Sequence, residues 1–92
     1  MSSRKCFICE RFETEYNPLE VHHIFGGANR KLSEKYGLKV LLCHSCHNEP
    51  PDGVHFNPEI MQNLHEFGQR AAMLRNGWSV EDFRKIFGKS YI

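Results

Sequence analysis

The chain has 92 residues, enough for one domain but too few for two independent hydrophobic cores. Hydrophobic residues make up 40% and charged residues 25%, the usage of an ordinary globular protein, which argues against a disordered chain. Twelve Lys and Arg against 11 Asp and Glu give a net charge of +1, so any nucleic-acid surface must be a local patch and not a uniformly basic coat.

No segment has the pattern of a membrane span or of an export signal. The longest unbroken apolar run covers only residues 40–43, whereas a membrane span needs about 20 residues. The first residues lead directly into a cysteine pair and not into a long apolar stretch, so no secretory signal is visible. The sequence therefore predicts a cytoplasmic protein with no membrane contact.

Four cysteines form two Cys-x-x-Cys pairs, separated by 33 residues. Two such pairs can supply the four soft tetrahedral ligands of a closed structural zinc site. Two disulfides or a redox pair are the alternatives, but disulfides need an exporting compartment and a thioredoxin-like motif needs only one pair. A core this small is only marginally stable, because the conformational entropy lost on folding, about 1.5 kcal/mol per residue, nearly cancels the free energy gained from apolar burial. We therefore expect a structural Zn²⁺ bound by Cys6, Cys9, Cys43 and Cys46.

The first half of the chain has the pattern of a hairpin. Apolar and polar side chains partly alternate over residues 19–25, and enough of these residues are β-branched to predict a short strand. This strand follows a polar connector and ends at two glycines. Residues 28–37 predict a basic loop, and residues 38–42 predict a second strand that leads into the second cysteine pair. We expect the two strands to pair around this loop.

The second half predicts two helices. Two consecutive prolines limit any helix after the second cysteine pair to a brief one. Asn57 as N-cap and Pro58 at the first helical position begin an amphipathic helix over residues 58–75. Its expected apolar face consists of Ile60, Met61, Leu64, Phe67, Ala71 and Leu74.

A capping box predicts a shorter second helix. Ser79 and Asp82 have the spacing of that box, and the helix continues over residues 80–87 to a stop at Gly88. Aromatic side chains at helical spacing are far more often core than base-stacking groups. We expect that core role for Phe67, Trp78, Phe83 and Phe87.

Three of the six histidines can converge on a second cation. His22 and His23 are neighbours on the predicted strand, so their side chains leave on opposite sides and serve different purposes. His47 directly follows the second cysteine pair, and His55 lies eight residues on, past a turn that can fold the chain back. We expect a metal group of His22, His47 and His55 with open positions for water and substrate. The other two histidines are expected to be solvated or at the edge of the core: His44 and His65.

A basic stretch lies between the two strands. Residues 26–42 carry four cations against Glu34 alone, a local excess of +3 that can neutralise backbone phosphates without reading bases. A merely solvated loop is the alternative, and the neighbouring histidines favour contact with DNA. The expected DNA-binding residues are Arg30, Lys31, Lys35 and Lys39.

The order of these motifs resembles the HNH endonuclease family. Cys-x-x-Cys, Leu-Glu-Val-His-His-Ile, a Gly-rich basic loop and Leu-Leu-Cys-x-x-Cys-His are similar to its small zinc-stapled members from phages and prophages, over residues 6–56. The resemblance implies an α+β fold in which a hairpin and a helix hold a metal ion. We expect a single domain over residues 1–92, with a zinc-stapled ββα-metal core over 1–56 and a helical extension over 57–92.

The resemblance also implies roles for individual histidines. In this family the first residue of the His-His pair binds the catalytic metal and the second is the general base, so His22 is the implied ligand and His23 the implied base. His47 stands at the position of the family's final histidine and is a second implied ligand, whereas His55 as a third ligand rests on its spacing.

One family position is missing from this chain. The family carries an Asn just before the second strand, where this sequence has Gly37-Leu38. Asn29 in the loop and Asn48 beside His47 are the candidates to replace it in orienting the loop of the base.

These expectations combine into a one-metal DNA endonuclease. Neutral imidazole accepts a proton from water near neutral pH, and a divalent cation (Mg²⁺, Mn²⁺, Ni²⁺ or Zn²⁺) acts as Lewis acid and template for phosphodiester hydrolysis. The alternatives are a non-catalytic zinc-knuckle module that binds nucleic acid or protein, and a degenerate nuclease kept as a subunit. A homodimer formed through the C-terminal helices is one way to cut both DNA strands.

Overall fold

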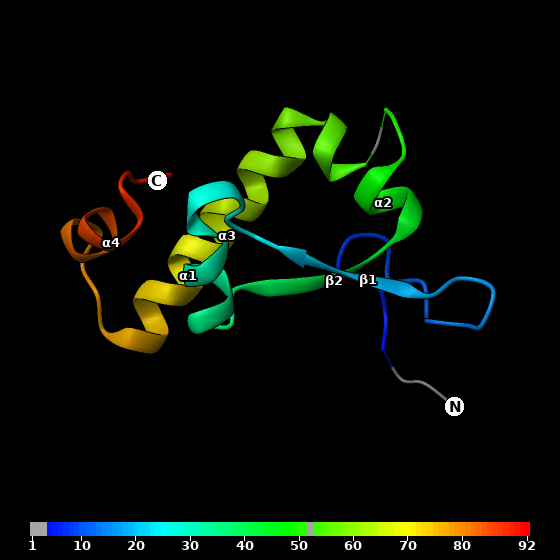
Figure 1. Cartoon of the computed structure of the whole chain (residues 1–92), viewed down its shortest axis with the longest axis horizontal. Helices are drawn as coiled ribbons and strands as arrows, with labels where there is room; N and C mark the ends of the chain where they lie inside the picture. Colours follow the sequence, from blue (N-terminus) through cyan, green and yellow to red (C-terminus); the bar gives the residue numbers. More distant parts are fainter. Residues whose placement is uncertain (1–3, 52) are drawn as a thin grey trace. The chain divides into compact units, whose positions relative to one another are not determined.

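The computed structural model describes residues 4–51 and 53–92 and is a small mixed α/β structure with one two-stranded sheet and four α-helices (Figure 1). This agrees with the expected α+β class, while the HNH core stays a prediction. The elements in chain order are β1 (Leu19–His23), the 3-10 helix η1 (Gly27–Asn29), α1 (Arg30–Lys35), β2 (Lys39–Cys43), α2 (His44–Asn48), the 3-10 helix η2 (Val54–Phe56), α3 (Pro58–Asn76) and α4 (Val80–Phe87).

Two compact units make up the chain, each assembled from two separate stretches of sequence. The cysteine unit comprises the described residues of Met1–His22 and Lys39–Met61. The helical unit comprises His23–Leu38 and Gln62–Ile92. The expectation of one domain over residues 1–92 stays a prediction.

Strands β1 and β2 pair with each other, as the sequence predicted. A backbone hydrogen bond of 3.0 Å from Ile24 N to Leu38 O, just beyond the paired strands, places the end of β1 against the start of β2, as in a hairpin. In β2 the side chains of Val40 and Leu42 are buried, while Lys39 is exposed. The first strand is two residues shorter than predicted, ending at His23.

The predicted loop over residues 28–37 is wrong, because most of it is helical. Helix α1 has the sequence Arg-Lys-Leu-Ser-Glu-Lys, mostly good helix formers, and its buried residue Ser33 anchors it. The Ser33 hydroxyl accepts a hydrogen bond from Phe25 N (2.9 Å) and donates one to Phe25 O (2.8 Å). Gly37, with φ of 67°, ends the segment in the left-handed conformation that glycine tolerates best. A loop assignment from composition could not foresee the contact between Ser33 and Phe25.

Helix α3 begins where the sequence predicted and runs one residue further, to Asn76. The Asn57 side-chain oxygen accepts hydrogen bonds from the backbone N–H groups of Glu59 (3.1 Å) and Ile60 (3.2 Å), so the predicted N-cap is confirmed. Helix α2 is brief, with five residues, also as predicted.

The predicted apolar face of α3 is wrong in part. Leu64 is buried, but Phe67 is 43% exposed and Leu74 is 86% exposed. The buried residues of α3 in the described chain are Leu64, Gly68, Gln69 and Ala72. The reason is Gly68: a Cβ atom there would lie 2.7 Å from Ile24 Cγ2, so the absence of a side chain lets Ile24 and Phe25 pack directly against the helix backbone.

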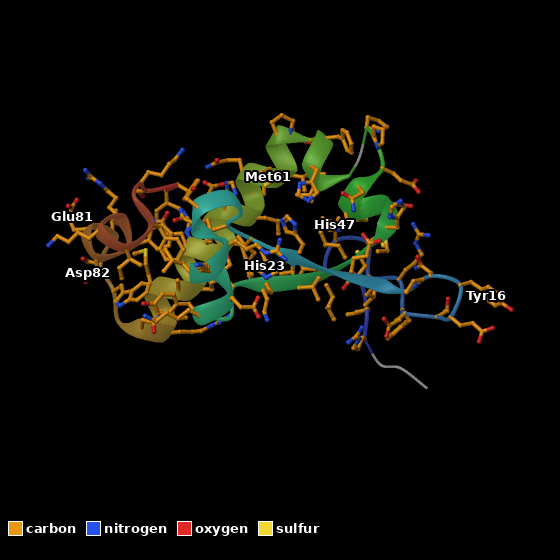
Figure 2. All side chains as sticks on the ribbon, in the orientation of Figure 1. Tyr16, His23, His47, Met61, Glu81 and Asp82 are labelled. Atoms are coloured by element: carbon orange, nitrogen blue, oxygen red, sulfur yellow. The ribbon has the colours of Figure 1, made fainter. Side chains whose placement is uncertain are left out.

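Helix α4 has the predicted ends and completes an aromatic core in the helical unit. The capping box at the start of α4 is confirmed, since Ser79 Oγ accepts from Asp82 N (3.1 Å) and the Asp82 carboxylate accepts from Ser79 N (3.0 Å); Figure 2 labels Asp82. Phe83 and Phe87 are buried, and their stacked rings have centroids 4.3 Å apart, which confirms their core role. Trp78 is only half-buried. No helix in the described ranges is long and apolar enough to span a membrane.

Gly68→Ala should destabilise the fold although alanine is the better helix former. The propensity gain of about 1 kcal/mol is smaller than the overpacking cost of about 1–3 kcal/mol expected where the new Cβ meets Ile24 and Phe25. Urea denaturation measures the difference, with the exposed position Asn63→Ala on the same helix as control, which should be neutral or slightly stabilising. A more stable Gly68→Ala variant would contradict this packing.

Candidate metal centres

The four cysteine sulfurs form one cluster in the cysteine unit. The Sγ atoms all lie within 4.8 Å of one another, and those of Cys9 and Cys43 are 3.6 Å apart. Four sulfurs around a tetrahedral zinc at about 2.3 Å are about 3.8 Å from each other, so the spacing fits this ion. All four cysteines are free, whereas a disulfide would need an S–S separation of about 2.05 Å. The cluster of Cys6, Cys9, Cys43 and Cys46 could therefore hold a structural zinc, as the sequence predicted.

Local backbone geometry brings the two cysteine pairs together. The first pair sits on a turn whose Phe7 N donates a 2.8 Å hydrogen bond to Leu41 O of β2, which ties the turn to the strand that ends in Cys43. Cys9 N approaches Cys6 Sγ at 3.5 Å. Glu10 has a φ of 63°, a left-handed conformation that lets the chain reverse after the turn, and its N–H donates to Cys6 O at 3.0 Å.

The thiols of this cluster differ in how readily they ionise. Burial disfavours the Cys6 thiolate, but backbone N–H groups of neighbouring residues hydrogen-bond to its sulfur and together lower its pKa to about 6. Burial raises the pKa values of Cys43 and Cys46, and the adjacent sulfurs raise that of Cys46 further. One thiolate thus forms easily, whereas ionisation of the further thiols is unfavourable. A bound divalent cation would stabilise all the thiolates together.

A second cluster consists of three imidazoles, also in the cysteine unit. The ring nitrogens of His22, His47 and His55 lie within 4.8 Å of one another, so this group could hold a metal ion, as the spacing predicted. The Nε2 atoms of His47 and His55 are 3.0 Å apart. Two neighbouring nitrogens about 2.1 Å from a metal are about 3.0 Å apart in octahedral and about 3.4 Å apart in tetrahedral coordination, so the observed distance is in the range of neighbouring ligands.

Three different elements supply these imidazoles. His22 comes from β1 and is 3% exposed, with its Nε2 atom fully buried and its ring centroid 5.2 Å from those of both other histidines. His47 comes from α2, directly after Cys46, and His55 from η2 (Figure 2 labels His47). Burial, and in second place His47, lower the pKa of His55, so its ring stays neutral and able to bind a cation at neutral pH.

A carboxylate that the sequence analysis did not single out supports this cluster. Glu20 Oε1 lies 2.7 Å from His47 Nδ1, and Glu20 Oε2 lies 3.1 Å from His44 Nδ1. The hydrogen bonds from His47 and His44 lower the pKa of Glu20 and keep it ionised. When Nδ1–H of His47 donates to this carboxylate, the lone pair of Nε2 is left for a metal. The available signal was that Glu20 precedes His22 by two residues and so shares its strand face.

His23 has a carboxylate partner as well, within the helical unit. Its Nε2 atom lies 2.5 Å from Glu34 Oε2 of α1. The His23 side chain is 16% exposed and that of Glu34 is 57% exposed. In the sequence Glu34 stands out only as a charge that offsets the basic residues around it, because its spacing from His23 matches no motif.

The two candidate orienting asparagines have other partners in the structure. Asn29 Nδ2 donates to Phe87 O at 2.9 Å and so stabilises the end of α4. Asn48 Nδ2 donates to Glu20 Oε1 and lies beside His47 Nδ1, both at 3.2 Å. An orienting role for either in the loop of the base stays a prediction.

The remaining predicted residues lie on the surface or at the edge of the core. His44 is exposed and His65 is partly buried against the Phe25 ring at 5.3 Å, with burial lowering the pKa of His65, so both expectations are confirmed. The four basic residues expected to bind DNA are all exposed, three on α1 and one at the start of β2: Arg30, Lys31, Lys35 and Lys39. Their contact with DNA stays a prediction.

Comparison with known protein families, with curated proteins and with solved structures finds no match for this chain. The resemblance to HNH endonucleases thus stays a prediction.

Cys43→Ser should remove the bound zinc and lower the free energy of unfolding by several kcal/mol, because structural zinc binding is folding free energy. Metal analysis of the purified chain and urea denaturation check this result. Ser45→Ala, inside the same Cys-x-x-Cys pair, is the control and should keep both zinc and stability. A zinc-free wild type that melts cooperatively would contradict the structural role of the cluster.

His55→Ala should weaken binding of a second ion at least about tenfold and leave the sulfur-bound zinc in place. Titration of the zinc-loaded chain with Ni²⁺ or Mn²⁺ in a calorimeter measures the second site separately from the first. His65→Ala removes a histidine outside the cluster and should bind both ions as the wild type does. Equal affinity in the two variants would show that the three imidazoles do not form a site.

Proposed function

We propose that this chain is a metal-dependent DNA endonuclease that hydrolyses phosphodiester bonds with one divalent cation. The observation that carries the proposal is the convergence of three imidazoles, which come from β1, α2 and η2. A fourth histidine, His23, directly follows His22 in β1. A binding module held together by zinc needs only the sulfur cluster and not the cluster of three imidazoles. The second cluster supports chemistry in addition to folding.

The proposed metal ligands are His22, His47 and His55. Three neutral nitrogen ligands leave further coordination positions for water and for a phosphate oxygen, the arrangement of catalytic sites as opposed to closed structural ones. Imidazole ligation suits Zn²⁺, Ni²⁺ or Mn²⁺, and Mg²⁺ with several waters is a further option. When bound, such a cation supplies Lewis-acid stabilisation of the phosphate and of the leaving 3′ oxygen.

The proposed general base is His23. It follows His22 directly, so the Cα atoms of ligand and base are about 3.8 Å apart, and the alternation of a strand directs the two rings differently. The base takes a proton from water, the hydroxide forms a bond to phosphorus, and the bond from phosphorus to the 3′ oxygen breaks. That oxygen then takes a proton from solvent, and the His23 imidazolium releases its proton to solvent.

Contacts to the DNA backbone are assigned to exposed cations. Lys31 and Lys35 are four residues apart on α1 and share one face of the helix, and Arg30 begins the same helix. Lys39 is exposed at the start of β2. Lysine and arginine contacts to phosphates give salt-sensitive binding with little choice of sequence. We further propose a cytoplasmic location and, as the resemblance implies, a phage or prophage gene in a bacterial host.

The sulfur cluster by itself equally supports a zinc-knuckle module that binds nucleic acid or protein without cleaving it. This alternative predicts zinc at the cysteines and no second ion. A degenerate nuclease would bind both ions and cleave nothing. The cleavage and metal-binding measurements separate the three.

His23→Ala should lower cleavage about 10²–10⁴-fold, the usual contribution of a general base, while zinc content and thermal stability stay those of the wild type. Supercoiled, linear and branched DNA are incubated with the zinc-loaded chain and Mg²⁺, Mn²⁺, Ni²⁺ or Zn²⁺, and products are separated on gels. His65→Ala serves as the histidine control. Full activity in His23→Ala would refute the base, and an inactive wild type with every ion would refute the nuclease.

A further inference from the structure

We infer that Glu34 is the positioning residue for His23: it holds the imidazole as the tautomer with the proton on Nε2, which leaves Nδ1 to act on water. The catalytic meaning of this inference rests on the proposed function. The contact itself is part of the structure, with 2.5 Å between His23 Nε2 and Glu34 Oε2.

The chemistry of the two groups decides the tautomer. A carboxylate has only hydrogen-bond acceptors, so the ring nitrogen that faces it must carry the hydrogen. In a neutral imidazole the other nitrogen then holds the lone pair, and for His23 this is Nδ1. The two atoms are within hydrogen-bonding distance, and the His23 side chain is only 16% exposed, so its ring has little freedom to turn away from the carboxylate.

The fold holds both members of this pair with one anchor. Ser33, the residue before Glu34, exchanges two hydrogen bonds with the backbone of Phe25, which lies two residues after His23. Ser33 O also accepts a 2.8 Å hydrogen bond from Leu38 N, which fixes the chain on the far side of α1. The buried contact between Ser33 and Phe25 thus sets the distance between α1 and the end of β1. Glu34 lies within α1, so this contact also sets the position of its side chain relative to His23.

This arrangement explains how the chain can work without the asparagine that its sequence lacks before β2. The base needs a group that fixes its ring, and a carboxylate on Nε2 does this directly. After His23 has taken a proton from water at Nδ1, the ring is an imidazolium whose Nε2–H still faces Glu34. The carboxylate stabilises that charge and does not itself take the proton.

Substitutions of Glu34 separate positioning from a general effect of charge. Glu34→Ala removes the acceptor, and kcat on plasmid DNA should fall about tenfold or more while KM stays within about twofold. Glu34→Gln keeps an acceptor oxygen without the charge and should lie between the wild type and Glu34→Ala. Glu59→Gln removes an equal charge from an exposed position on α3 and is the control that should keep wild-type rates. Wild-type or higher kcat in Glu34→Ala would overturn the inference.

The tautomer is measured without reference to cleavage. Nitrogen-15 NMR of the zinc-loaded full chain with Mg²⁺, at a pH where the ring is neutral, should show His23 with its hydrogen on Nε2, and a mixture of both tautomers in Glu34→Ala. A hydrogen on Nδ1 in the wild type, or an unchanged spectrum in the variant, would overturn the inference. If the wild type cleaves no DNA, the proposed function fails while this spectrum still decides the role of Glu34.

Discussion

The meeting of the two cysteine pairs is the constraint on which the cysteine unit depends. Four sulfurs from two distant stretches of the chain lie within 4.8 Å of one another, and a structural zinc bound there would contribute its binding free energy to folding. Because Cys43 ends β2 and Cys46 lies in α2, an ion bound at these sulfurs would fix both elements at once. His47 follows Cys46, so the position of the imidazole cluster is set by the sulfur cluster next to it.

In the enzyme we propose, the two carboxylates would give the histidines different tasks through their tautomers. Glu20 faces Nδ1 of His47, which leaves Nε2 of that ring for a cation. Glu34 faces Nε2 of His23, which leaves Nδ1 of that ring for water. One acidic side chain would thus favour a metal ligand and the other a general base, although the histidines themselves are chemically the same.

The sequence predicted those features that follow from a hydrophobic period, from the spacing of metal-binding residues or from a helix-capping residue. Both clusters, the hairpin, the Asn57 cap and the capping box at Ser79 follow from such local rules and agree with the structure. The errors arise where tertiary contacts decide. Ser33 anchors a helix in a segment that resembles a loop, and Gly68 rotates the buried face of α3 by offering no side chain. Glu34 was overlooked as a partner of His23 because a single acid without a repeat leaves no pattern.

The shortness of α2 links the chemistry of the cysteines to that of the histidines. A helix of five residues has no stability of its own in water and persists only because its neighbours hold it. Oxidising the thiols would release the ion at the sulfurs, α2 would unravel, and His47 would leave its cluster. Hydrolysis would then stop without any damage to a catalytic side chain, so the enzyme we propose would work only in a reducing environment.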